Sequence, residues 1–198
     1  KEKLDAGGFR VRDISECSNV DVIYTTDDPT DSLDYHRYLR EDASFTTTVS
    51  PGFRPDKGLA IRKPGFTDWV KRLEAKSVSP ITSYDTFLSA LEVQVKHFHG
   101  NGCRMSDHGL DEVAFTEVTK DEAAAIFDKR LSGADISREE EIKYQTATLL
   151  FLGRLYHQYG WTMQLHIGAL RNNNTRMFKQ LGPDTGFDSV NDKEIAEP

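Results

Sequence analysis

This 198-residue chain has little cysteine, no long apolar run and no excess of positive charge. Its two cysteines, Cys17 and Cys103, lie far apart, which predicts free thiols in a reducing compartment and excludes a disulfide-built scaffold. Because no stretch of 18 or more residues is apolar, we expect no membrane-spanning helix. The formal net charge of −7 argues against a nucleic-acid binder, which would carry a clustered basic face.

The first residues also lack the apolar segment that directs proteins to export. Residues 1–8 are polar, so we expect no signal peptide and a cytoplasmic protein. Without export, the glycosylation sequon Asn173-Asn174-Thr175 is a chance match. No internal repeat or low-complexity tract occurs, which excludes solenoids and propellers. What remains is an ordinary globular chain, long enough for one domain or two small ones.

The hydrophobic pattern alternates between strand and helix signals. Short apolar or β-branched runs predict strands at residues 20–26, 45–50, 103–106 and 162–167. Helical patterns cover residues 31–40, 67–76, 83–99 and 138–159, and capping boxes stand at residues 119–122 and 137–140. Strands that alternate with helices predict an α/β fold with a parallel sheet and crossover helices.

The two longest helical patterns each carry an apolar stripe that we expect to be buried. In residues 83–99 the stripe consists of Phe87, Leu88, Leu91, Val95 and Phe98. In residues 138–159 it consists of Ile142, Leu149, Leu152, Leu155 and Tyr156. Gly100 and Gly160 end these patterns, as glycine commonly does after a helix.

Polar groups stand at or just beyond the end of each predicted strand. The first strand runs into Asp27 and Asp28, the second into a turn with Arg54, the third into Asp107 and His108, and the fourth carries His166. Ligands of parallel α/β proteins bind at the carboxyl ends of the strands. The sequence therefore predicts one site to which all four strands contribute.

Several of these groups also have a purely structural interpretation. Asp28 before Pro29 is favoured as a helix N-cap. Arg54 either grips a ligand carboxylate or forms a surface ion pair with Asp56, and a lone histidine such as His108 is more often structural.

Two further groups near a helix end receive structural interpretations as well. His97 and His99 are interpreted as compensating the helix dipole rather than binding a metal, because residues two apart do not share a helix face. Cys103 is interpreted as a small core residue.

The stretch from the fourth strand onward is the most informative part of the chain. Burial of Met163, Leu165 and Ile167 would turn His166 to the opposite face of the strand. Beyond it, Arg171, Arg176 and the run Asn172-Asn173-Asn174 offer donors for an anionic, polyhydroxylated small molecule. The alternative, a well hydrogen-bonded surface loop, fits the spacing equally well.

Four motifs resemble the uronate isomerase (glucuronate isomerase) family of the amidohydrolase superfamily: TTDDPTDSLDYH at 25–36, PGFRPDK at 51–57, GCRMSDHGLD at 102–111 and MQLHIGALRNNNTRMFKQLGPDTGFDSVND at 163–192. The resemblance implies a partial (β/α)8 barrel with about four parallel strands. Because chains of that family are more than twice as long, residues 1–198 are expected to be a central fragment without the first and last strands. The metal-binding His-x-His pair would precede Lys1, and a metal-binding aspartate would follow Pro198.

The implied reaction interconverts D-glucuronate and D-fructuronate, and D-galacturonate and D-tagaturonate. The resemblance makes His166 and Arg54 candidate catalytic residues, and the candidate substrate-binding residues are Arg54, Arg171, Asn172, Asn173 and Asn174. Asp184, Gly186 and Asp188 are expected to shape the loop. A divalent metal, with zinc expected, belongs to the complete enzyme rather than to this fragment, in which His166 is the one candidate ligand.

Two alternatives stay open. The chain could be an inactive fragment that only binds an anionic sugar, or part of a metal-dependent hydrolase that uses a zinc-activated water. The RNNN and PGFRPDK motifs favour the sugar-acid branch. The expected partner is a small uronate, and no nucleic acid or membrane is expected. A homo-oligomer is expected because four strands cannot close an eight-stranded barrel.

Overall fold

The computed structural model describes residues 9–196, in which four parallel strands form one sheet in the order β1-β2-β3-β4. The strands are β1 (Val22–Asp27), β2 (Thr48–Phe53), β3 (Met105–Leu110) and β4 (Thr162–Ile167). The helices are α2 (Val11–Cys17), α3 (Asp34–Glu41), α4 (Asp56–Leu59), α5 (Phe66–Glu74), α6 (Tyr84–Gly100), α7 (Lys120–Leu131), α8 (Arg138–Gln158) and α9 (Thr175–Leu181). The predicted α/β class, with parallel strands and crossover helices of a partial barrel, is confirmed.

The expectation about a signal peptide concerns residues 1–8, which lie outside the described residues. Within residues 9–196, no helix combines the length and the apolar character that crossing a bilayer requires.

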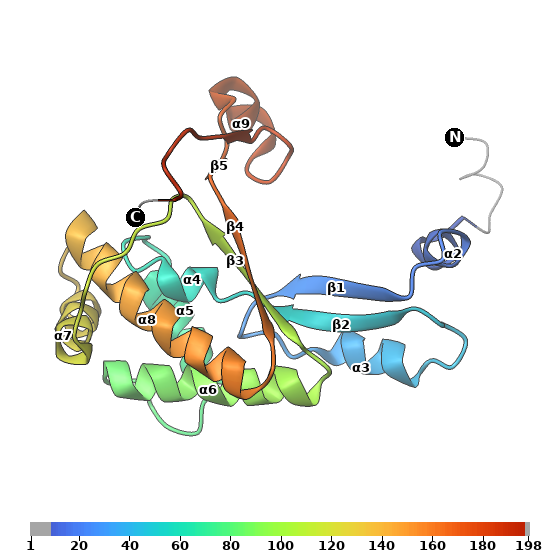
Figure 1. Cartoon of the computed structure of the whole chain (residues 1–198), viewed down its shortest axis with the longest axis horizontal. Coiled ribbons are helices and arrows are strands. Elements are labelled where there is room, and N and C mark those ends of the chain that lie inside the picture. Colours follow the sequence, from blue (N-terminus) through green and yellow to red (C-terminus); the bar gives the residue numbers. More distant parts are fainter. Residues whose placement is uncertain (1–8, 197–198) are drawn as a thin grey trace.

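The sheet consists of two strand pairs that meet at a single point. β1 pairs with β2 over their whole length, and so do β3 and β4, but β2 and β3 share only the pair Phe53 and Ser106. In Figure 1 the two pairs diverge from this point. Arg54 follows directly after it, so the join between the strand pairs lies beside the residue predicted to be catalytic.

The core lies between the sheet and helices α4 to α8, which cover one side of β3 and β4 (Figure 1). It is built largely from aromatic rings, among them Phe53, Phe66, Trp69, Phe87, Phe127 and Tyr144. The stripe predicted on α6 is buried throughout, as are Leu152, Leu155 and Tyr156 on α8. The prediction was wrong for Ile142 and Leu149, which are half-buried, because α8 turns Tyr144 and Thr148 into the core instead.

The boundaries of the first three strands differ from the predicted ones, most of all in the second and third. The second strand runs through Pro51 to Phe53 rather than ending at Ser50. Proline is tolerated because β3 does not pair with β2 before Phe53, so that edge needs no donor at Pro51. The third strand begins at Met105, beyond Cys103, and continues through Asp107, His108 and Gly109. The polarity of these residues is typical of a loop, but they belong to the strand, which places Asp107 and Gly109 in the candidate site.

Leu165 was predicted to be buried and is 45% exposed. Together with Met163 and Leu149 it lines an apolar groove of about 710 Å³ between β4 and α8. β4 is the last strand of the sheet, and no described strand pairs with its outer edge. The strand pattern was correct, but the other surface needed to bury this side chain is not among residues 9–196.

A small excursion follows β4. Strands β5 (Ala169–Leu170) and β6 (Ser189–Val190) form an antiparallel pair, and α9 lies between them in the sequence. In Figure 1 this segment stands beyond the end of β4, apart from the main helical layer, and no residue of α9 is buried. The sequence analysis predicted none of these three elements.

Candidate active site

The alternation of side chains along β3 and β4 creates a polar face, defined by Asp107, Gly109, Gln164 and His166. Asp107 is the register partner of Gln164, and Gly109 is the partner of His166. Their neighbours Ser106 and His108 point to the opposite, buried side. The predicted orientation of His166, away from Met163 and Leu165, follows from the same alternation.

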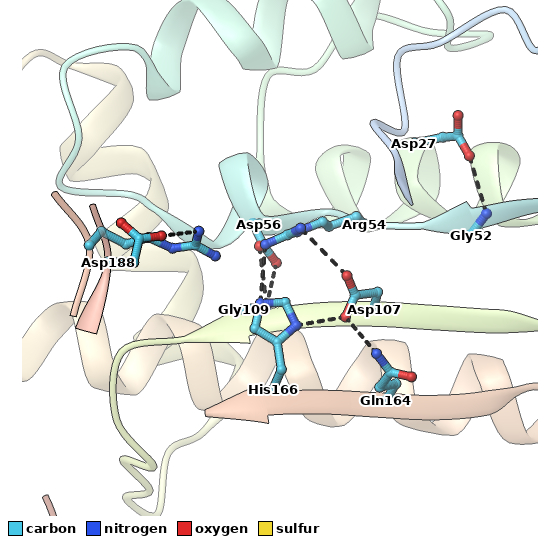
Figure 2. Close-up of polar contacts among 10 residues, drawn as sticks. Asp27, Gly52, Arg54, Asp56, Asp107, Gly109, Gln164, His166 and Asp188 are labelled. Atoms are coloured by element: carbon cyan, nitrogen blue, oxygen red, sulfur yellow. Dashed lines mark hydrogen bonds and ion pairs between the residues drawn. The ribbon is translucent and has the colours of Figure 1, made fainter. Parts of the chain in front are cut away.

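His166 is held between an acidic residue, Asp107, and a basic residue, Arg54. Its Nδ1 lies 2.8 Å from Oδ1 of Asp107, and its Nε2 lies 3.2 Å from Nη2 of Arg54 (Figure 2). A guanidinium only donates hydrogen bonds and a carboxylate only accepts them. Neutral His166 therefore carries its proton on Nδ1, donates it to Asp107, and accepts from Arg54 at Nε2.

Arg54 emerges just past the end of β2 and spans the gap to β3 and β4. Its Nε donates to Oδ2 of Asp56 at 2.7 Å, and its Nη1 lies 3.5 Å from Oδ2 of Asp107. The predicted ion pair with Asp56 is therefore present, while the remaining nitrogens face the polar face and the ligand-binding role of Arg54 stays a prediction. Figure 2 shows the guanidinium directed toward Asp107 and His166.

Asp107 links the cluster together; it was among the groups predicted to form the site, but the sequence indicated no specific role for it. One of its oxygens faces His166 and also accepts from Nε2 of Gln164 at 3.3 Å, while the other faces Arg54. The pattern that could have indicated the role of Asp107 is the alternation of side chains along the strand. Once β3 is extended to Leu110, Asp107 and Gly109 fall on the same face as Gln164 and His166 in the next strand.

Asp56 forms the other anchor of Arg54. Its two oxygens accept from the backbone N–H of Gly109, each at 3.2 Å, so the carboxylate joins α4 to β3. Burial raises the pKa of Asp56, and the adjacent Arg54 opposes that shift by favouring the charged form.

The polar residues at the end of β1 do not contact this cluster. Asp27 accepts from Thr25 at 2.6 Å and from the N–H of Gly52 at 3.2 Å. The predicted N-cap at Asp28 is wrong, since the next helix begins only at Asp34. Asp28 instead accepts from the indole of Trp69 at 2.9 Å and pairs with Lys57 at 3.0 Å.

His108 is buried beneath β3, and its structural interpretation fits its surroundings. Its Nε2 lies 3.2 Å from the hydroxyl of Ser106, and its ring packs against Tyr156. Burial lowers the pKa of His108 to about 4. Cys103 is likewise buried as predicted, and burial raises the pKa of its thiol to about 11.

His99 at the end of α6 does not act as the predicted positive charge at the helix terminus. Its Nδ1 accepts from the indole Nε1 of Trp161 at 3.0 Å, which requires a lone pair on that nitrogen. Burial also lowers the pKa of His99, which likewise favours the neutral ring. The ring therefore ties the end of α6 to the start of β4 instead of compensating the helix dipole.

The residues after β4 form most of their hydrogen bonds within the excursion itself. Arg171 donates to Asp188 at 2.9 Å, and the N–H of Asn172 donates to the same carboxylate at 2.8 Å. Asn172 has a left-handed backbone with φ of 56°, and the side chain of Asn174 caps α9 by accepting from Met177. Asp188 thus shapes the loop as predicted. The substrate-binding roles of Arg171, Asn172, Asn173 and Asn174 stay predictions.

The donors of the polar face do not make up a metal site on their own. Among residues 9–196, no three His, Cys, Asp or Glu side chains are grouped to hold an ion. Nε2 of His166 accepts from Arg54, so a metal would have to displace that contact, while Asp107 holds the other ring nitrogen as acidic groups commonly do for metal-bound histidines. The described residues therefore form no complete metal site, and His166 as a metal ligand stays a prediction.

The fold and the cluster define an α/β protein of the (β/α)-barrel type, with its candidate active site at the carboxyl ends of parallel strands. Sequence comparison identifies which one. The chain matches the glucuronate isomerase family over residues 1–198 and belongs to that family.

Individual relatives agree with this assignment. A uronate isomerase of Bacillus subtilis is 55% identical over 98% of this chain, and one of Clostridium acetobutylicum is 54% identical over 96%. The crystal structure of uronate isomerase from Thermotoga maritima matches 94% of the chain with a TM-score of 0.85 and 33% identity. Glucuronate isomerase from Caulobacter crescentus matches 98% with a TM-score of 0.87 and 26% identity. The chain spans about two fifths of the length of these relatives.

Proposed function

We propose that this chain is the central part of an aldose–ketose isomerase that interconverts D-glucuronate with D-fructuronate and D-galacturonate with D-tagaturonate. Membership in the glucuronate isomerase family supports the reaction class. The observation that carries the proposal is the contact of Arg54 with His166 across three strands, with Asp107 between them. The match to about two fifths of the relatives supports a fragment, and the first and last barrel strands would lie outside it.

The reaction moves a proton between C2 and C1 of the open-chain sugar and needs a base as well as cations that bind the substrate oxygens. Nε2 of His166 is the basic atom of the polar face, and Asp107 stabilises the imidazolium that forms when it takes a proton. Arg54 binds substrate oxygens with the Nη nitrogens that now face His166 and Asp107. Substrate entry therefore frees Nε2 at the moment when it is needed.

Arg171 is proposed to supply a second cation for the uronate, from a guanidinium that Asp188 holds in place. A divalent metal, with zinc expected, belongs to the complete enzyme, and its ligands would lie outside this chain, because Nε2 of His166 cannot bind a metal and take a proton at once. Bound there, it would polarise the substrate carbonyl as a Lewis acid. The complete protein is proposed to be a cytoplasmic homo-oligomer.

The test compares the isolated 198-residue chain with the full-length protein that carries it, both with D-glucuronate and added zinc. We expect the full-length protein to form D-fructuronate and the isolated chain to form none, because most of the barrel is missing. Turnover by the isolated chain close to that of the full-length protein would overturn the fragment proposal. Hydrolysis of ester or amide substrates without any isomerisation would favour the hydrolase alternative.

A further inference from the structure

One point on β3 stands out because three side chains of the candidate site converge on it. A Cβ added to Gly109 would lie 2.7 Å from Nε2 of His166, 2.8 Å from Nη2 of Arg54 and 3.1 Å from Oδ2 of Asp56. Contacts that short do not occur with real side chains, so only glycine permits the observed arrangement. The φ angle of Gly109 is not positive, which means that space rather than backbone conformation requires glycine here.

Asp56 occupies the other side of the same point. It accepts from the backbone N–H of Gly109 with both oxygens and from Nε of Arg54 with one of them. The guanidinium is thus fixed at Nε, and its Nη nitrogens remain directed at His166 and Asp107. Asp107 approaches Nη1, so the two carboxylates use different nitrogens of Arg54 and have distinct tasks.

We propose that Asp56 and Gly109 are positioning residues for the isomerase site: Asp56 orients the guanidinium of Arg54 through Nε, and Gly109 provides the space in which Arg54 meets His166. Neither residue needs to touch the substrate. This inference rests on the proposed function for its effect on catalysis, but the contacts themselves can be measured without turnover.

The atoms that a Cβ at position 109 would displace are the far ends of flexible side chains. Gly109→Ala should therefore leave the fold in place, since alanine is less unfavourable in a strand than glycine and keeps the N–H that binds Asp56. It should still move Nε2 of His166 and Nη2 of Arg54 apart. Misplacement on this scale commonly costs about 100-fold in rate. Gly100→Ala is the matched control, because nothing lies within 4 Å of a Cβ built at Gly100.

The experiment uses the full-length protein that carries this chain. We expect Gly109→Ala to lower kcat/KM for D-glucuronate about 100-fold, while the melting temperature stays within about 3 °C of the parent. Gly100→Ala should change neither quantity. A Gly109→Ala enzyme with kcat/KM within about twofold of the parent would overturn the role of Gly109.

Asp56 is tested with Asp56→Asn and Asp56→Glu, and with the Nε–H signal of Arg54 in nitrogen-15 NMR, assigned by its loss in Arg54→Lys. We expect Asp56→Asn to remove the protection of this N–H from solvent exchange and to lower kcat/KM about tenfold or more. Asp56→Glu should restore part of both. In an Arg54→Ala background, Asp56→Asn should cost less than about threefold, because its effect passes through Arg54. Asp42→Asn, which removes the exposed partner of Arg12, is the control.

The outcomes separate the two proposals. If Asp56→Asn leaves the Arg54 N–H protected, the positioning role is overturned whatever the activity. If protection is lost and kcat/KM stays within about twofold, Asp56 has no positioning role in the reaction. If protection is lost but the parent protein isomerises no uronate, the contact stands and the proposed function is overturned. If Asp56→Asn does not fold, Gly109→Ala carries the test.

Discussion

Two polar regions of this molecule were both predicted to bind substrate, yet they use their polar atoms differently. At the ends of β2, β3 and β4, Arg54, Asp107 and His166 come from three separate segments and satisfy one another across the sheet. In the excursion after β4, Arg171 and Asn172 bind Asp188 within the same short segment.

The difference distinguishes groups held ready for a ligand from groups that build a loop. On the proposed function, a substrate would replace Arg54 on His166, because that contact joins two flexible side-chain ends. By contrast, Asn174 is committed to the first turn of α9, and replacing it would cost the helix its cap. A run of polar residues in a sequence therefore does not by itself indicate a site, because its hydrogen-bonding groups can instead build a loop.

The largest effect should come from Arg54. We expect Arg54→Ala to lower kcat/KM about 1,000-fold in the full-length protein, because a charged donor is lost from a partly buried site. Arg54→Lys should recover little, since an ammonium cannot bridge Asp56, Asp107 and a substrate oxygen at once. Steady-state kinetics with D-glucuronate measures this, with Arg12→Lys on the surface as control. Unchanged kinetics would remove Arg54 from the site.

A second test compares the two faces of β3, because His108 lies opposite Asp107. Burial lowers the pKa of His108 to about 4, whereas the unfolded chain keeps the ordinary value near 6.5. The unfolded state therefore binds the proton more readily. Stability from this group is complete above pH 6.5 and is lost as the pH falls toward 4, by about 3 kcal/mol in the limit.

The measurement is urea unfolding between pH 7 and pH 4.5. His108→Gln cannot titrate, so its unfolding free energy should fall less steeply with decreasing pH than that of the parent. His157→Gln, at an exposed position of α8, should keep the parent's slope. Equal slopes for His108→Gln and the parent would show that His108 is not held neutral by burial.

The smaller effects concern the excursion and test whether its polar residues bind substrate or only build the loop. Asp188→Asn weakens the hold on Arg171 and should raise KM for D-glucuronate about tenfold, with kcat nearly unchanged. Asn174→Ala removes the cap of α9, which costs about 1 kcal/mol locally, and should change kcat/KM less than about threefold.

Steady-state kinetics of the two variants side by side provides the readout. A loss of tenfold or more in Asn174→Ala, without a change in melting temperature, would contradict the structural interpretation. It would instead make Asn174 a substrate contact, as the resemblance to the family implied.

Much of the fold could be predicted because it depends on local patterns. The stripe on α6, the capping boxes at Thr119 and Ser137 and the fourth strand follow from periodicity and end signals that neighbouring residues carry. The alternation of strands and helices likewise determined the parallel sheet. The excursion was not predicted because its asparagines resemble a loop, although Asn174 is in fact the N-cap of α9.

By itself, the sequence determined the class of fold and the family, and it predicted Arg54, Asp107 and His166 among the groups of one site, through residues that stand at strand ends and in long motifs. Only the tertiary structure decided that Asp56 and Gly109 join them, and that Asp27, Asp28 and His108 do not. The physical reason is register. Which face a strand residue occupies depends on where the strand begins and on which neighbour it pairs with, and neither is written in the residues of that strand alone.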